Sequence, residues 1–590
     1  MFRRTCFAWL LALLALLRFD TARTQDAAAA GDLAFQQLAD QFIDGYYLPA
    51  NPSAATQAGV HRYDARLDAY DRAAIERQAR QLHVWERRFA QVDAATLSER
   101  LAGDRAMLLS NVRSTLLTLE TIRPWQNNPD IYSSGVAASV FVVMERDYAP
   151  AAQRLRYVIG RERQVPQALR QAHRNLRNPP EIFTRIAIEQ LPGTIDFFEH
   201  DLPDAFAGVR ERALQAQFRR SNAAVIAALR GYLDWLNTDV LPRSHGDFRL
   251  GAVTFSAKLR YDEMVDMPLD QLLEIGTTDL KRNQRAFARV AHELEPDRSA
   301  REVLAELDRD HPAPQQLLAS FRATFDGLTA FIREHHIITI PDGPAPTLEP
   351  TPPFERATTL ASMDAPGPFE TGSTTAYFNV TLPQPDWDAP RVEGFMAAFN
   401  YPAISNTAVH EAYPGHYLQF LWDRQISDRV RLLFGAASNF EGWAHYCEQM
   451  MLDEGFGQAG PGADPEQQRR ALRLRLGQIK DALLRDARFI VGIRMHTGSM
   501  SYEQAIDFFH DEGYQSREDA ETESKRGTSD PTYLYYTLGK LQIQKLRADV
   551  AARQGASFSL QRFHDDFMRQ GLPPIKLVRR ALLGDDSPAL

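Results

Sequence analysis

Residues 410–416 read His-Glu-Ala-Tyr-Pro-Gly-His, and this stretch combines a metal-binding pattern with a break in the chain. A His-Glu pair on a helix is typical of zinc hydrolases, in which the second histidine usually follows the first by four residues. Here position 414 is proline, and His416 follows His410 by six residues. Six steps of about 100° would place His416 on the wrong face of an unbroken helix.

The two residues before His416 can interrupt the helix. Pro414 has no amide hydrogen and its ring crowds the carbonyl of His410, while Gly415 accepts backbone angles that other residues resist. We therefore predict a helix that begins at Asn406 or Thr407 and is kinked or widened at Pro414-Gly415. Such a kink would bring His416 back towards His410.

A third ligand is expected from residues 439–448, which read Asn-Phe-Glu-Gly-Trp-Ala-His-Tyr-Cys-Glu and look helical. Glu441 and Glu448 are seven residues apart and so share a face. We predict one Zn²⁺ held by His410, His416 and Glu441, with the fourth position open for water. Glu411 would take a proton from that water and pass it to the leaving amine. Glu448 would support a ligating histidine by a hydrogen bond.

Each feature also has a purely structural interpretation. The His-Glu pair could be an accidental cluster, because such pairs arise by chance in long chains. His445 is expected to be a packed or solvated histidine, and Trp443 and Tyr446 to be helix-packing aromatics. Cys447 is expected to be a small buried hydrophobe.

The rest of the chain is typical of a large soluble protein. Its 590 residues are 44% apolar and 24% charged, enough for two or three domains or for one large multi-lobed enzyme. From about 33 to 330 apolar residues recur at helical steps, as in Ile75, Ala79, Leu82, Trp85 and Phe89. Prolines and β-branched runs then predict a small sheet near residues 337–389, with strands at 337–340 and 377–382. Helical texture returns near Val392.

The N-terminus has the pattern of a secretory signal peptide over residues 1–24. Arg3 and Arg4 precede an apolar run, 7–17, that is too short to span a bilayer comfortably. We expect a periplasmic or secreted protein without membrane attachment after cleavage; a retained signal anchor is the alternative. Cys6 precedes the apolar run, where a lipoprotein cysteine would not lie.

Cleavage would leave Cys447 as the one cysteine, which excludes an intramolecular disulfide and a cysteine-rich metal cluster. The formal net charge is −9; removing four arginines and one aspartate with residues 1–24 lowers it by three, to −12. This acidity argues against a nucleic-acid partner. Any metal must be held by histidines and carboxylates.

These motifs resemble those of a bacterial family catalogued as domain of unknown function eight-eight-five, regarded as zinc peptidase-like and related to helical zinc carboxypeptidases. The strongest marks are residues 410–416 followed by Leu418-Gln419, and Glu441-Gly442-Trp443-Ala444 with Tyr446 and Glu448. The resemblance spans nearly the whole mature chain. It implies a mainly α-helical, two-lobed architecture around a deep cleft, a single zinc ion and amide-bond hydrolysis. We expect an N-terminal helical lobe at 25–330 and a catalytic lobe at 331–590.

Such enzymes stabilise the oxyanion with histidine or tyrosine donors, and His496 and Tyr536 are the predicted catalytic donors here. The family pattern carries a histidine at position 496, although Gly492 stands where an acidic residue is expected. A substrate carboxylate needs a cation, and three residues compete for this role: Lys540, Arg526 and Arg488.

These later residues also have structural alternatives. His496 and Tyr536 could be satisfied core polar groups, Lys540 a surface residue, and Arg526 part of a solvated charged run, 521–526.

The predicted function is a zinc-dependent metallopeptidase that hydrolyses short peptides, as a carboxypeptidase, dipeptidase or oligopeptidase. One alternative is a noncatalytic periplasmic binding or scaffolding protein with a structural metal, for which a closed four-ligand site is expected. Another is a zinc amidohydrolase of a nonpeptide substrate, which would differ only in its pocket.

Overall fold

The computed structural model describes residues 29–351, 360–384, 387–460 and 462–590. The predicted signal peptide, 1–24, lies outside the described residues. Among the described helices, none combines the length and apolar character of a membrane-spanning segment.

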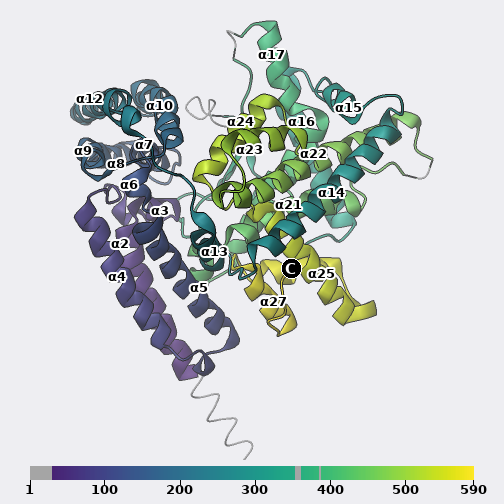
Figure 1. The fold of residues 1–590 in the computed structure, drawn as a ribbon, viewed down its shortest axis with the longest axis horizontal. Coiled ribbons are helices and arrows are strands. Elements are labelled where there is room, and N and C mark those ends of the chain that lie inside the picture. The colour runs from purple at the N-terminus through teal and green to yellow at the C-terminus, as the bar shows by residue number, and fades with distance from the viewer. Residues whose placement is uncertain (1–28, 352–359, 385–386, 461) are drawn as a thin grey trace, which may run out of the picture.

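The N-terminal half is a stack of helices, purple to blue in Figure 1. Helix α4 begins where the Asp71 side chain accepts a hydrogen bond from the Ala74 amide, and it buries Ile75, Ala79, Leu82 and Phe89 as its periodicity predicts. The helical segments in chain order are 29–42, α2 Leu48–Ala50, α3 Pro52–Gln57, α4 Arg72–Gln91, α5 Glu99–Leu116, α6 Pro124–Asn127, α7 Asp130–Met144, α8 Ala151–Glu162, α9 Val165–Asn175, α10 Glu181–Asp196, α11 Leu202–Ala205 and α12 Arg212–Trp235.

Helices of the second half form the other side of the molecule, teal to yellow in Figure 1. They are α13 Gly251–Asp262, α14 Leu269–Leu294, α15 Ala300–Leu307, α16 Leu317–Glu334, α17 Ala389–Met396, α18 Tyr401–Glu411, α19 His416–Asp423, α20 Arg429–Leu433, α21 Ala437–Asp453, α22 Pro465–His496, α23 Tyr502–Asp511, α24 Arg517–Ser529, α25 Tyr535–Gln554, α26 Leu560–Met568 and α27 Ile575–Leu583. The mainly helical fold class is therefore confirmed.

The hydrophobic cores cross the predicted lobe boundary at residue 330. Helix α14 lies along α22, with Leu280 and Phe287 buried against Leu476 and Leu483. Helix α13 joins a cluster with α22 and α25. The division at 330 stays a prediction; α14 packs along the C-terminal helix α22, whereas α13 contacts both α5 of the N-terminal half and α22.

A three-stranded sheet lies within the predicted β region, in the order β1-β3-β2. Strand β3 pairs in parallel with β1 and antiparallel with β2, and its Phe378 and Val380 are buried in the largest core. The strand expected at 377–382 is confirmed, whereas the one expected at 337–340 is wrong: Ile337 and Ile338 fill the same core as irregular chain after α16. The strands are β1 Thr347–Pro350, β2 Ala361–Asp364 and β3 Tyr377–Val380.

Candidate metal centre

Helix α18 carries the first histidine and begins earlier than predicted. The Asn400 side chain accepts a hydrogen bond from the Ala403 amide at 2.9 Å, and Pro402 lies in the first turn. Both are preferred at a helix start, so the expected start at Asn406 or Thr407 is wrong. Asn406 lies inside the helix, where its side-chain amide donates to Asp481 of α22.

The helix breaks where Pro414 and Gly415 predict it. Helix α18 ends at Glu411, and α19 begins at His416. Within the turn, the Gly415 amide donates to the Val409 carbonyl at 3.0 Å, and a Cβ on Gly415 would lie 1.8 Å from the carbonyl oxygen of His410. Only glycine allows this close return of the chain.

The break brings His410 and His416 together, with ring centroids 4.8 Å apart. One oxygen of Glu441, Oε2, lies 3.4 Å from His410 Nε2 and 3.5 Å from His416 Nε2. Ligands about 2.1 Å from a tetrahedral zinc ion would lie about 3.4 Å from one another. The distances from Glu441 to the two imidazoles therefore match those between ligands of a zinc ion.

The Glu441 side chain is 18% exposed, and its Oε2 is buried and has no hydrogen-bond partner among the described residues. Burial would raise the pKa of this carboxyl, but the two imidazoles hold its pKa well below the usual range. Burial would likewise lower the pKa of His410, whereas Glu441 and Glu448 raise this pKa to about 10. An unpartnered buried carboxylate oxygen between two imidazoles fits a cation bound to all three groups.

A second carboxylate, that of Glu411, lies at the same site. The ligand atoms of His410, Glu411 and His416 all lie within 4.8 Å of one another. Glu411 is half-buried in the last turn of α18, and the described contacts give its carboxylate no ion pair. Glu441 contacts both imidazoles, so the assignment of Glu441 as ligand and Glu411 as the neighbouring base is compatible with the geometry and stays a prediction.

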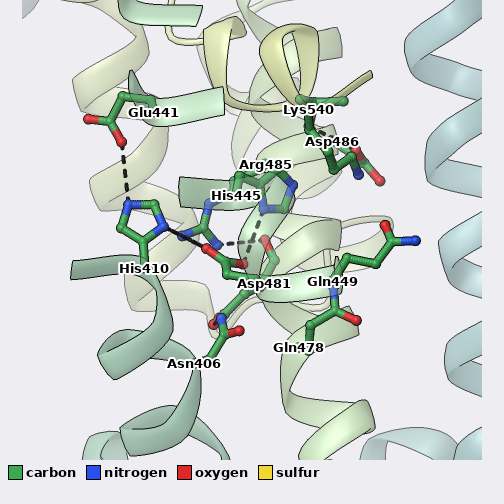
Figure 2. A network of polar contacts seen from close by, with 12 residues as sticks. Asn406, His410, Glu441, His445, Gln449, Gln478, Asp481, Arg485, Asp486 and Lys540 are labelled. Atoms are coloured by element: carbon green, nitrogen blue, oxygen red, sulfur yellow. Dashed lines mark hydrogen bonds and ion pairs between the residues drawn. The ribbon is translucent and has the colours of Figure 1, made fainter. Parts of the chain in front are cut away.

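Behind His410 lies a buried carboxylate, Glu448, which confirms the predicted hydrogen bond to a ligating histidine. Its Oε1 lies 2.6 Å from His410 Nδ1 and 3.0 Å from an Arg485 guanidinium nitrogen, and its Oε2 lies 3.1 Å from His445 Nδ1. Figure 2 shows Glu441 on one side of His410, and Arg485 and His445 on the other. Donation from Nδ1 to Glu448 leaves Nε2, which faces Glu441, as the nitrogen of His410 that a metal ion would bind.

Two glycines fix the helix that brings Tyr536 to this site. Helices α21 and α25 touch backbone to backbone, because a Cβ on Gly442 would lie 2.4 Å from the Gly539 Cα. Gly442 follows Glu441 directly and Gly539 lies three residues after Tyr536, so the crossing brings together the helix segments that carry Glu441 and Tyr536. The Tyr536 ring centroid lies 6.4 Å from that of His410.

Three arginines surround the Tyr536 ring, with guanidinium carbons 5.1 to 5.9 Å from its centroid. Arg488 is held by two bonds of 2.7 Å to Glu523, and Arg485 by Glu448. Arg526 has longer contacts: 3.2 Å to the hydroxyl oxygen of Tyr535, 3.3 Å to Asp530 and 3.5 Å to the hydroxyl oxygen of Tyr536. Of the predicted substrate cations, Arg526 is therefore the least committed to a partner.

Lys540 and His496 are placed away from the cluster. Lys540 is fully buried and pairs with Asp279 of α14 at 2.8 Å, so both the predicted substrate contact and the surface alternative are wrong for it. His496 Nε2 lies 2.7 Å from the Gly527 carbonyl, and the ring packs against Phe248 and Phe255. This placement does not favour its predicted role as an oxyanion donor.

Sequence reasoning missed Arg485, and of the two alternatives for His445 the structure shows the packed one. His445 is fully buried against Glu448, and burial lowers its pKa to about 3, so it is neutral. Arg485 could have been found from its spacing: it lies one helical turn before Arg488 in α22, and Arg488 was a predicted substrate-binding residue. Trp443 and Cys447 are buried core residues, as expected.

Comparison with known proteins shows the fold but assigns no activity. The family described as "Bacterial protein of unknown function (DUF885)" matches residues 52–582. A candidate lipoprotein of unknown function from Shewanella oneidensis is 26% identical, with a TM-score of 0.78 over 93% of this chain and 99% of that one. A candidate lipoprotein from Colwellia psychrerythraea shares the fold at 17% identity, with a TM-score of 0.76 over 93% and 98%. No curated protein matches the chain.

Proposed function

Because this chain belongs to the bacterial DUF885 family, whose description leaves the function open, we propose from its site that it is a zinc-dependent peptidase acting on short peptides. The observation that carries the proposal is the single Glu441 oxygen placed 3.4 and 3.5 Å from two imidazole nitrogens. A donor set of two histidines and one carboxylate is that of catalytic zinc sites such as those of the metalloproteases.

When bound, Zn²⁺ supplies a Lewis acid that polarises the scissile carbonyl and lowers the pKa of a coordinated water to about 7. Glu411 accepts a proton from the attacking water and delivers it to the leaving nitrogen. Burial raises the pKa of Tyr536, as does the charge of Glu441, so its phenol remains an O–H donor for the developing oxyanion. Glu448 keeps His410 in the orientation that binds metal.

Arg526 is proposed to bind the carboxylate of the substrate. It is one of the three cations predicted for this role, with Arg488 and Lys540. Arg488 and Lys540 already have carboxylate partners at 2.7 and 2.8 Å, whereas Arg526 approaches Asp530 at 3.3 Å. Its side chain is 36% exposed, so an incoming carboxylate reaches it without displacing a buried ion pair. A guanidinium binds a carboxylate by two parallel hydrogen bonds. This choice favours cleavage near a free C-terminus.

The rival function is a noncatalytic protein with a structural metal, and the position of Glu411 is what favours it. If Glu411, within 4.8 Å of both histidines, were a fourth ligand, the site would be closed and no position would remain for water. The two functions differ in what Glu411 does: a ligand contributes to zinc affinity, and a base contributes to turnover.

The test is the Glu411→Gln variant, assayed with zinc against a library of short peptides. We expect turnover to fall by about 100-fold or more while the zinc Kd stays within a factor of a few. Glu393→Gln, an exposed glutamate on α17, is the matched control. A large loss of zinc affinity would instead support the closed structural site, and unchanged turnover would overturn the proposed base.

Export from the cytoplasm is proposed on two grounds. Residues 1–24 have the composition of a signal peptide. The similar solved proteins from Shewanella and Colwellia are candidate lipoproteins. Sequencing the N-terminus of the protein recovered from the periplasm would test this proposal, and recovery of the uncleaved chain from the cytoplasm would contradict it.

A further inference from the structure

A cavity of ≈ 220 Å³ lies apart from the metal cluster, between the N-terminal helices and the end of α22. None of the proposed metal ligands lines it. His496 does, and His496 follows Arg485 by eleven residues of continuous helix, about 16 Å along the axis. The cavity is therefore a separate site, and it includes the buried histidine that the proposed peptidase chemistry does not use.

The hydrogen bonds of His496 fix its protonation. A carbonyl only accepts, so the nitrogen 2.7 Å from the Gly527 oxygen, Nε2, must carry the hydrogen. Burial lowers the pKa of His496 to about 4, so the ring is neutral and Nδ1 holds a lone pair. Nδ1 is buried and has no partner among the described residues, and such an acceptor requires a donor.

The remaining lining suits a small polar molecule. Phe183 and Phe248 provide aromatic surface, and the side chains of Asn128 and Thr254 provide polar groups. Asp247 and Arg249, exposed at the same cavity, present one carboxylate and one guanidinium 3.2 Å apart. The volume is below the roughly 300 Å³ at which drug-sized pockets begin. Paired opposite charges beside a small cavity match the ammonium and carboxylate of a zwitterion.

The last turn of α24 lies between the two sites. Arg526 faces Tyr536, the next residue supplies the carbonyl that holds His496, and Thr528 and Ser529 line the cavity. A molecule in the cavity would therefore contact the helical turn that carries Arg526.

We propose that this cavity is a second ligand site, which binds a free amino acid with its ammonium and carboxylate groups at Asp247 and Arg249 and a hydrogen-bond donor turned towards His496. The site goes beyond the proposed peptidase, since it can bind its ligand whether or not the metal centre is catalytic.

The test is calorimetric titration of the full chain with each of the common free L-amino acids. We expect at least one to bind with a Kd of about 1 mM or tighter, and its N-acetyl amide, which lacks both charges, to bind at least tenfold more weakly. Two cavity variants, Thr254→Val and His496→Gln, should weaken binding at least tenfold. Thr329→Val, the same change in a different cavity on α16, is the matched control.

Arg526→Ala separates the cavity from the metal site. Binding retained in Arg526→Ala but lost in Thr254→Val would place the amino acid in the cavity. Binding lost in Arg526→Ala and kept in both cavity variants would place it at the metal site and overturn the proposal, as would the absence of any binding amino acid. Equal binding of the N-acetyl amide would overturn the zwitterion. Should His496→Gln fail to fold, Thr254→Val decides alone, because it changes a half-buried hydroxyl for a methyl group of similar size.

Discussion

Replacing Glu448 by glutamine should weaken zinc binding, although Glu448 is not itself a proposed zinc ligand. The carboxylate makes three contacts, at 2.6 Å to His410, 3.1 Å to His445 and 3.0 Å to Arg485. Glutamine keeps one acceptor oxygen and turns an NH₂ group towards donors that need an acceptor. At least one contact is lost, and the bond to His410 changes from charged to neutral.

The size of the effect follows from these contacts. A hydrogen bond to a charged group contributes about 1.5–3 kcal/mol, against about 1 kcal/mol for a neutral one. Because His410 is then less well oriented and less basic, we expect the free energy of zinc binding to weaken by about 1.4–2.8 kcal/mol. This loss raises the zinc Kd about 10- to 100-fold, as is common for such supporting carboxylates.

The assay is zinc competition against a chromophoric chelator, with circular dichroism to establish that the variant is folded. Glu454→Gln is the matched control, since Glu454 lies at the end of the same helix and pairs with Arg547 at 2.6 Å, away from the cluster. An unchanged zinc Kd in folded Glu448→Gln would refute the reasoning that Glu448 orients His410. Absence of zinc binding by the unaltered chain would refute the metal centre itself.

Three further predictions follow from other contacts. Gly442→Ala should lower the free energy of unfolding by about 1–3 kcal/mol, because its Cβ would lie 2.4 Å from the Gly539 Cα; Gly394→Ala, with open space around it, should not lower it, and equal urea midpoints would contradict the close helix contact. Arg526→Ala should raise KM about 10- to 100-fold for peptides with a free C-terminal carboxylate and leave amidated peptides unchanged; an equal rise for both would rule out a carboxylate contact. Burial raises the pKa of Glu162 to about 8, so the protonated carboxyl stabilises the fold below pH 4.5, and this stability is lost as pH rises through 8. The free energy of unfolding should therefore fall between pH 6 and 9, and Glu162→Gln should reduce that fall by roughly 2–3 kcal/mol. An equal fall in both proteins, measured by urea unfolding across this pH range, would contradict the prediction.

Local chemistry predicted part of this site well. The interruption at Pro414 and Gly415 follows from the missing amide hydrogen and the missing Cβ, both of which are readable from two residues. Glu441 and Glu448 share a face because helical periodicity is regular. The grouping of His410, His416 and Glu441 could be predicted because histidine and glutamate are the side chains that catalytic zinc sites use. The structure brings all three together.

What the sequence did not predict depends on distant partners. Lys540 is buried because Asp279, 261 positions earlier, neutralises it, and no local pattern reports that pairing. Arg485 belongs to the site through Glu448 of another helix. The Ile337–Ile338 run has the composition of a strand, and both side chains are buried in the core. Its backbone, however, does not pair with the sheet of β1, β3 and β2 in the described residues. The start of α18 was missed because Asn406 and Asn400 are equally good caps, and Pro402 decides between them.

The three proposed ligands come from three separate helices, α18, α19 and α21, so an ion bound as proposed would link these helices and stabilise the fold. An ion that binds only the folded arrangement adds RT ln(1 + [L]/Kd) to stability, about 4 kcal/mol at a thousand times the Kd. If zinc binds as proposed, its removal would free the ends of these helices from a shared ion, and we expect the chain to open more often and to be cut faster by proteases. The lifetime of the protein in its compartment should therefore follow the zinc concentration there, even when no substrate is present.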